Sequence, residues 1–234
     1  MKAPMLVSAV LPLMLPFGVF ANEKAAGAAD YLKKISFHSP SMPGYRTADI
    51  LTSGFVGASV TMSSNSKFLN LNDLTFRVSR NWLEVKPHHE GRVTLRMVRQ
   101  PKADERATTL VIHNRKTGQS QAFSFYVKTW LTGDGVIDAN TSQARKHCER
   151  LGGKLLTTQA FRDLSRQWFG LSSGYLREMY PGATLFNAQA QAGDSFWVNE
   201  GKSVYLHTGI KSHTRTVNTL CQHQYPALHQ ETRG

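Results

Sequence analysis

The chain has 234 residues, of which 41% are hydrophobic and 10% aromatic, and its formal net charge at pH 7 is +12. Enough apolar side chains are present to bury a core, which excludes an intrinsically disordered protein. The positive charge favours contact with polyanions such as nucleic acid or lipopolysaccharide. However, Lys and Arg are scattered and never form a run of four, a pattern more typical of ordinary solvated surface charge.

Residues 1–21 predict an export signal. Lys2 is the only charged residue there, an apolar run from Ala3 to Phe20 follows, and positions 19 and 21 suit signal peptidase. We therefore expect cleavage between Ala21 and Asn22. The alternative is a transmembrane anchor, which three prolines in a run at the short end of a membrane span disfavour. We expect an exported mature chain without a membrane span, whose destination is the medium, the cell surface or the periplasm.

Residues 22–30 are rich in alanine and read as a flexible lead-in. From residue 31 to residue 132 the sequence predicts short β-strands. Apolar and polar residues alternate over Leu74–Val78 and Trp82–Lys86, as expected of half-buried strands. Further strands are expected at residues 51–62, 92–98, 108–113 and 122–131, with a turn at 114–118. About six or seven strands at this spacing predict a β-sandwich.

The pattern changes near residue 133, where we expect a domain boundary. A helix that begins at residues 140–142 would place Ala144, Cys148 and Leu151 on one face and would end at Gly152–Gly153. The other expected elements are a second helix at 158–168, with Phe161, Leu164 and Trp168 inward, and short strands at 195–199, 203–206 and 217–221.

Cys148 and Cys221 are the only two cysteines. In an oxidising compartment an isolated pair usually forms one structural disulfide. The alternative is a pair of free thiols in a catalytic or metal-binding role. Neither cysteine stands in a Cys-x-x-Cys motif, and their separation fits no pair of zinc ligands. We therefore predict a single disulfide.

Residues 144–158 combine a helical cysteine, a Gly-Gly stop and a Leu-x-Thr strand start. This segment resembles the C-type-lectin-like domain that ends intimin and invasin, the outer-membrane adhesins of enteric bacteria, and Trp197 and Cys221 fall where that pattern places them. The resemblance implies an all-β plus α+β architecture, with an immunoglobulin-like β-sandwich at residues 31–132 and a C-type-lectin-like domain at residues 133–234.

The resemblance also implies a function in adhesion. In size and signal the chain is similar to small exported proteins found beside an intimin-like outer-membrane protein in the zinc-regulated adhesion and secretion system of enteric bacteria. The implied partner is therefore an intimin-like outer-membrane protein or another exported immunoglobulin-like protein, and not nucleic acid. An exposed edge of the sandwich could also take up a strand from another immunoglobulin-like domain.

The polar loops between about residues 172 and 199 are the predicted contact surface. Tyr and Arg in such a loop suit a protein-binding hot spot, and we expect Arg177, Tyr180, Asp194 and Asn199 to contact the partner. The alternative for a loop tyrosine is that its ring folds back onto the core.

No cofactor, metal or catalytic residue is expected. Calcium-dependent sugar binding needs several oxygen ligands, and the loop from Ala183 to Asn199 offers Asp194 as its only acid. The nine histidines show no zinc-ligand spacing, and no motif of a serine hydrolase, zinc protease or phosphate loop occurs. Two alternatives to adhesion remain open, a basic polyanion binder with salt-sensitive affinity and an exported hydrolase.

Overall fold

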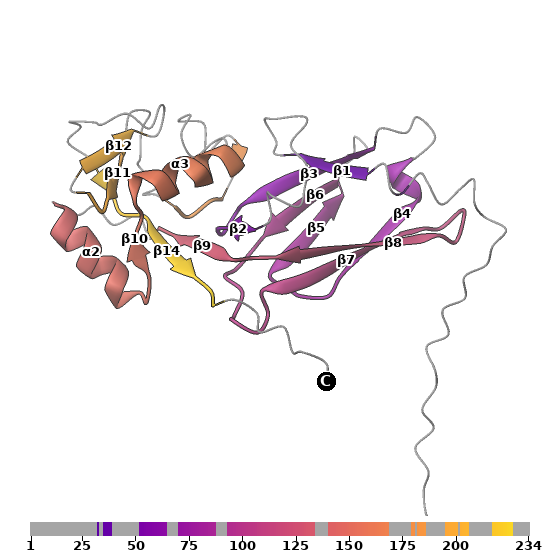
Figure 1. Ribbon diagram of the computed structural model, residues 1–234. Helices are drawn as coiled ribbons and strands as arrows, with labels where there is room; N and C mark the ends of the chain where they lie inside the picture. The colour runs from indigo at the N-terminus through magenta and orange to yellow at the C-terminus, as the bar shows by residue number, and fades with distance from the viewer. Residues whose placement is uncertain are drawn as a thin grey trace, which may run out of the picture.

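The computed structural model describes residues 32, 35–38, 52–64, 70–87, 93–133, 140–168, 179–180, 182–185, 195–200, 202–205 and 217–226. Over these residues the protein is mostly β-sheet with two α-helices (Figure 1). None of the helices found there is long and apolar enough to cross a membrane. The predicted signal segment and the lead-in lie outside the described residues.

Strands dominate the described chain before residue 133, and both α-helices follow that position. In chain order the elements are β1 (Ile35–His38), β2 (Ser53–Gly54), β3 (Ser59–Ser64), the short 3-10 helix η3 (Leu71–Asp73), β4 (Leu74–Val78), β5 (Leu83–Pro87), β6 (Val93–Met97), β7 (Ala107–Asn114), β8 (Ser120–Tyr126), β9 (Thr129–Thr132), α2 (Thr141–Arg150), β10 (Lys154–Leu155), α3 (Thr158–Gln167), β11 (Ser195–Val198), β12 (Lys202–Tyr205), β13 (Val217–Asn218) and β14 (Cys221–Gln224).

Two antiparallel sheets form a sandwich in the first half of the chain (Figure 1). One has the strand order β1-β3-β6-β5 and the other β4-β7-β8. Their inward residues alternate with less buried ones, as on β6, where Val93, Leu95 and Met97 are buried and the residues between them are half-buried. The sheets meet through aromatic contacts, with the ring centroid of Phe37 on β1 lying 5.2 Å from that of Phe123 on β8.

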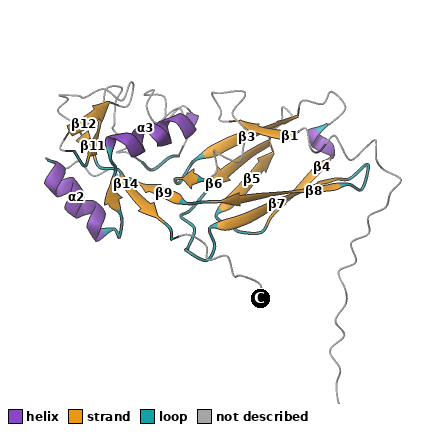
Figure 2. Cartoon of the chain, viewed as in Figure 1, coloured by secondary structure: helices purple, strands orange, loops and turns teal. Residues whose placement is uncertain are grey.

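The second half contains both α-helices and contributes strands to two further sheets (Figure 2). One sheet has the order β10-β14-β9-β2 and the other β12-β11-β13. In the first of these, β9 and β2 come from before residue 133 and β10 and β14 from after it. This sheet therefore joins the two halves of the chain through backbone hydrogen bonds.

A buried aromatic cluster lies where the two halves meet, and we call it the junction cluster: Phe55, Trp168 and Tyr180. Each of the three side chains is fully buried. The ring of Phe55 lies 5.3 Å from both Trp168 and Tyr180, in edge-to-face contacts that are favourable for aromatic pairs. The indole Nε1–H of Trp168 donates to the Oγ of Ser53 at 2.8 Å. One continuous hydrophobic core thus extends across residue 133.

At two glycines the backbone lies closely against the segment of residues 182–185. At Gly57, where φ is +91°, a Cβ atom would lie 2.6 Å from the amide nitrogen of Ala183. At Gly133 a Cβ atom would collide with the carbonyl group of Leu185. Both positions require glycine because no side chain fits between the two segments.

The end of the described chain is held against the sandwich by Arg106, which is buried. Its guanidinium carbon lies 4.9 Å from the ring centroid of Tyr126 and 5.7 Å from that of Tyr225, and it donates to the carbonyl oxygen of Pro226. The hydroxyl of Tyr225 donates to the carbonyl oxygen of Pro101 at 2.6 Å. Cation–π contacts of this kind are strongest when the cation is desolvated.

The expected β-rich first half and the two expected helices are confirmed, and four details of the prediction are wrong. Leu151 is 42% exposed, because α2 ends at Arg150 and Leu151 no longer follows its buried face. The strand expected at 51–62 breaks between β2 and β3, the strand expected at 122–131 breaks between β8 and β9, and the strand expected at 217–221 breaks between β13 and β14. In each case the chain passes from one sheet to another at the break.

Candidate functional site

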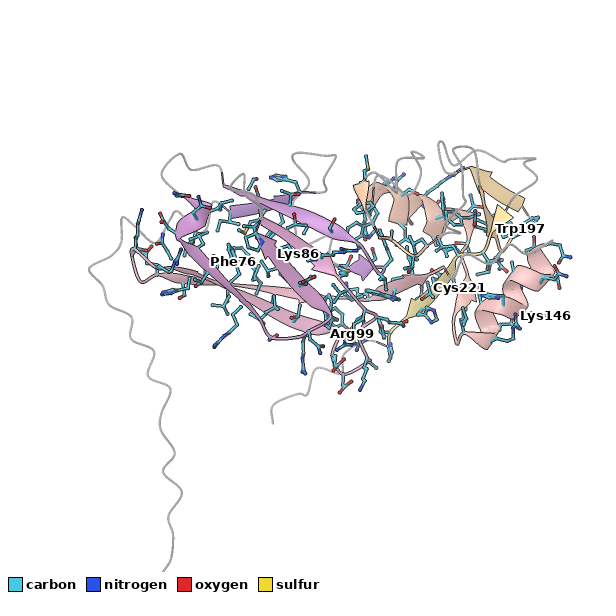
Figure 3. All side chains as sticks on the ribbon, turned by 180° about the vertical axis from the view of Figure 1, so that it is seen from behind. Phe76, Lys86, Arg99, Lys146, Trp197 and Cys221 are labelled. Carbon is cyan, nitrogen blue, oxygen red and sulfur yellow. A yellow bond between two sulfur atoms is a disulfide. The ribbon has the colours of Figure 1, made fainter. Side chains whose placement is uncertain are left out.

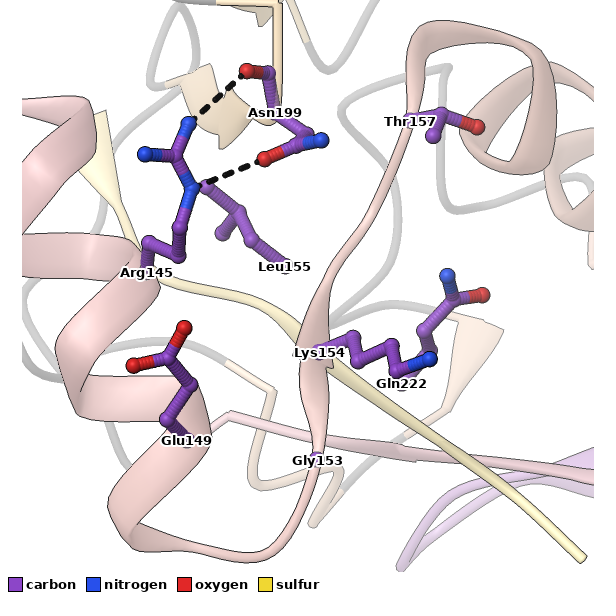
Figure 4. Close-up of a pocket in the computed structure, with 8 residues that line it drawn as sticks. All are labelled: Arg145, Glu149, Gly153, Lys154, Leu155, Thr157, Asn199 and Gln222. Atoms are coloured by element: carbon purple, nitrogen blue, oxygen red, sulfur yellow. Dashed lines mark hydrogen bonds between the residues drawn. The ribbon is translucent and has the colours of Figure 1, made fainter.

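A groove with a volume of about 480 Å³ lies beside α2 and β10, at the end of the molecule away from the sandwich (Figure 4). We call it the α2 groove. It is lined by Arg145, Glu149, Gly153, Lys154, Leu155, Thr157, Asn199 and Gln222.

Helix α2 forms one wall because its sequence separates a buried face from an exposed one. The side chain of Asn140 caps the helix by accepting a hydrogen bond from the Gln143 amide at 3.0 Å. Ala144, His147 and Cys148 are buried. Arg145 and Glu149 are exposed and lie four residues apart, so both side chains project from the same side of the helix, toward the groove (Figure 4).

The predicted disulfide between Cys148 and Cys221 is confirmed, with a Cα–Cα distance of 5.2 Å. It fixes α2 to β14, and the two cysteines pack with Ala144 and Leu155 in a small core cluster against which Trp197 lies. Figure 3 shows Trp197 and Cys221 on the inner side of α2 and Lys146 on its outer side. The disulfide thereby holds the helical wall of the groove in place.

The opposite wall is a turn at Asn199–Glu200, and Arg145 holds it in position. The Nε of Arg145 donates to Oδ1 of Asn199 at 3.0 Å, and its terminal nitrogen donates to the Asn199 carbonyl oxygen at 3.2 Å. The Asn199 amide donates to the carbonyl oxygen of Leu156 at 2.8 Å. A planar guanidinium that makes two bonds to one residue fixes both distance and orientation.

Glu200, the second residue of the turn, is fixed at the start of α3. Its carboxylate accepts hydrogen bonds from the amide and the hydroxyl of Thr158, at 3.1 to 3.2 Å. The side chain of Thr157 caps the same helix by accepting from the Ala160 amide at 3.1 Å. A carboxylate is favoured at a helix N-terminus because the free amides and the helix dipole are positive there. The turn is therefore anchored on both α2 and α3.

Three polar side chains of the groove have no such partner. Glu149, Lys154 and Gln222 make no side-chain hydrogen bond or ion pair with any residue in the described part of the chain. Lys154 and Gln222 are register partners on β10 and β14, and Glu149 lies on the α2 side (Figure 4). The groove therefore offers a free carboxylate, a free ammonium and a free amide, a mixture suited to a protein surface that carries both charges.

One histidine beneath the groove has a shifted pKa. Burial lowers the pKa of His223 below its ordinary value, and a hydrogen bond with the backbone of Gly152 opposes this shift. The ring packs against Gly153, where a Cβ atom would lie 2.9 Å from Cε1 of His223. Burial therefore favours the neutral form of this ring.

The four predicted contact residues have different outcomes. Asn199 lies in the α2 groove, whereas Arg177 and Asp194 lie outside the described residues. Tyr180 was expected at the surface and is instead completely buried in the junction cluster, so the alternative of a loop tyrosine folded onto the core is correct. Its neighbours Phe55 and Trp168 offer it more apolar contact than a solvated loop could.

Sequence reasoning missed Arg145, Glu149, Lys154 and Gln222. The spacing of Arg145 and Glu149 on an exposed helical face was the available signal. Their meeting with Asn199 depends on tertiary structure, because Arg145 and Asn199 are 54 residues apart.

No family model matches the sequence of the chain, and no curated protein is significantly similar to it.

Proposed function

We propose that this protein is an exported adhesion module that binds another exported or outer-membrane protein through the α2 groove. The observation that carries the proposal is the contrast within the groove. Glu149, Lys154 and Gln222 have no described partner, while the pair of Arg145 and Asn199 beside them is fixed by two hydrogen bonds.

This arrangement suits recognition for an energetic reason. Binding costs free energy when side chains and loops must become ordered, and here the turn at Asn199–Glu200 is already held from two sides. The free charges can then set the orientation of a partner and exclude partners of the wrong charge pattern.

The sequence supports the same function. Residues 144–158 resemble the lectin-like end of intimin and invasin, and the predicted signal segment implies export to a compartment where the disulfide forms. An intimin-like outer-membrane protein or an exported immunoglobulin-like protein fits this setting as the partner. The sandwich then acts as a support, because the junction cluster makes one core of both halves.

The test is affinity capture from the envelope of the producing bacterium, with the purified protein as bait at low and high salt. We expect one exported or outer-membrane protein at both salt concentrations. Glu149→Lys reverses a charge in the groove and should weaken capture by at least about tenfold, as expected for a desolvated charge contact. Asp104→Lys makes the same charge change in an exposed turn of the sandwich and should leave capture unchanged.

Two results would refute the proposal. Equal capture by both variants would show that the α2 groove is not the contact surface. Recovery of lipopolysaccharide or nucleic acid alone, lost at high salt, would instead favour the polyanion binder suggested by the net charge of +12.

A further inference from the structure

The edges of the sandwich differ in how well they are protected. An edge strand exposes unpaired backbone N–H and C=O groups, which pair readily with a strand of another chain unless charge, proline or short length prevents it. Among the described strands, the sandwich has four edges, which are β1 and β5 in one sheet and β4 and β8 in the other.

Three of these edges are short or protected. β1 has four residues and β4 and β5 have five each. On β5, Glu84 and Lys86 form an ion pair at 3.4 Å, Pro87 has no N–H group, and the N–H of Leu83 donates within the chain to the Arg80 carbonyl oxygen at 3.5 Å. β4 carries the exposed cation Arg77. A new strand would find few free donors on β5 and a charge on β4.

β8 has none of these protections. It is seven residues long, Ser120–Tyr126, and contains neither a charged residue nor proline. Its partner β7 lies on one side only, and no described strand pairs with its other side, where Nε2 of Gln121 donates to the carbonyl oxygen of Ala122 at 3.1 Å. Of the four edges it offers the longest uninterrupted backbone.

The register of the β7–β8 pair shows which backbone groups of β8 point away from β7. At one end of the β7–β8 pair the Asn114 amide donates to the Gln119 carbonyl oxygen, and at the other the Val127 amide donates to the Arg106 carbonyl oxygen. In an antiparallel pair the bonded residues alternate, so the odd-numbered residues of β8 face β7. The outward-facing backbone groups therefore belong to Ser120, Ala122, Ser124 and Tyr126.

The side chains next to this edge define what an added strand must carry. On the inner face Phe123 is only partly buried, and it contacts the fully buried Phe37 of the opposite sheet. On the outer face Ser120, Ala122 and Ser124 are small and exposed. A strand with apolar residues at alternate positions would cover Phe123 with its apolar face. On its other face it would lie beside small residues, which leave room for its side chains.

Charge argues against a second copy as the occupant. Exposed cations lie beyond both ends of β8, with Arg115 in the hairpin before it and Lys128 after it. Lys116, also in the hairpin, is paired with Asp73 at 2.9 Å. Antiparallel pairing of β8 with its own copy would bring the hairpin cations of one molecule near Lys128 of the other. Each molecule also carries a net charge of +12. A strand flanked by acidic residues is complementary at both ends.

We propose that the free edge of β8 takes up an extended strand of a different protein, apolar at alternate positions and flanked by acidic residues. This extends the proposed function, since it assumes a protein partner and assigns it a second contact. The backbone would supply the binding energy, and Phe123 and the flanking cations would set the register.

The test uses a short peptide of alternating valine and threonine with two aspartates at each end, added to the purified protein and followed by NMR. We expect saturable shifts of the Ser120, Ala122 and Ser124 amides, and at least about tenfold weaker binding of the same peptide with lysines at its ends. Ala122→Pro removes an outward N–H without touching the β7 ladder and should weaken binding by at least about tenfold. Ala122→Val keeps the N–H and should bind normally.

Several results would overturn this inference. One is the absence of saturable shifts at about 1 mM peptide, a concentration that detects even weak complexes. Another is equal binding by Ala122→Pro and Ala122→Val. A third is strong protection of the Ala122 amide from hydrogen exchange in the absence of peptide, which would show that the edge is already paired within the chain. Glu149→Lys should bind the peptide normally, so failure at the β8 edge is distinguishable from failure at the α2 groove.

Discussion

Removal of the Phe55 ring should destabilise both halves of the protein together. Phe55 belongs to the strand region of the first half, yet its fully buried ring lies 5.3 Å from Trp168 and Tyr180 of the second half. A buried Phe→Ala substitution costs about 3–5 kcal/mol of folding free energy. For a protein of this size each kcal/mol lowers the melting temperature by about 2–4 °C, so Phe55→Ala should lower it by roughly 6–20 °C.

Hydrogen exchange measured by mass spectrometry shows which parts of the protein lose folding free energy in Phe55→Ala. If the halves share one core, the slowest amides of β6 and β7 and those of α3 should all exchange faster, by roughly a thousandfold for a loss of about 4 kcal/mol. Phe76→Ala is the matched control, because Phe76 is a partly exposed phenylalanine of β4 and should cost much less. Faster exchange in the sandwich with unchanged exchange in α3 would refute a shared core.

Three further predictions concern the helical end. Replacing Cys148 and Cys221 together by serine should cost about 4 kcal/mol in the chain-entropy model for a separation of 73 residues, and a urea midpoint equal to that of the wild type would contradict this. Because burial lowers the pKa of His223, its contribution to stability is present above about pH 6.5 and is lost as the pH falls below that value. The urea midpoint should therefore decrease between pH 7 and pH 5, less steeply in His223→Gln, and parallel profiles would argue against this residue. Thr157→Ala removes the cap of α3 and should cost about 1 kcal/mol, measured by thermal unfolding with Thr157→Ser as the conservative control.

The sequence predicts the elements of this fold well where local rules decide. β4 begins and ends where the alternation of Leu74–Val78 predicts, and α2 begins after Asn140 and stops before Gly152, whose φ is +71°. These features depend on neighbours a few residues away. The disulfide was predictable for another reason, since only two cysteines exist.

The arrangement of the elements depends on contacts that local patterns do not contain. Tyr180 stands in a polar loop without periodicity, and only the proximity of Phe55 explains its burial. Likewise, Arg145 bonds to Asn199 across 54 residues. Short strands such as β1, with four residues, are too brief for a clear alternation. The immunoglobulin-like and lectin-like assignments, and adhesion itself, remain predictions.

The disulfide also has a mechanical consequence. When a molecule attached at both ends is pulled, a covalent bond between Cys148 and Cys221 carries the tension directly, and the chain between them cannot extend. A separation of 73 residues corresponds to roughly 250 Å of extended chain. Pulling cannot release this length until the disulfide is reduced. Helix α3 and the turn at Asn199–Glu200, which lie between the two cysteines, are thus removed from the path of the force.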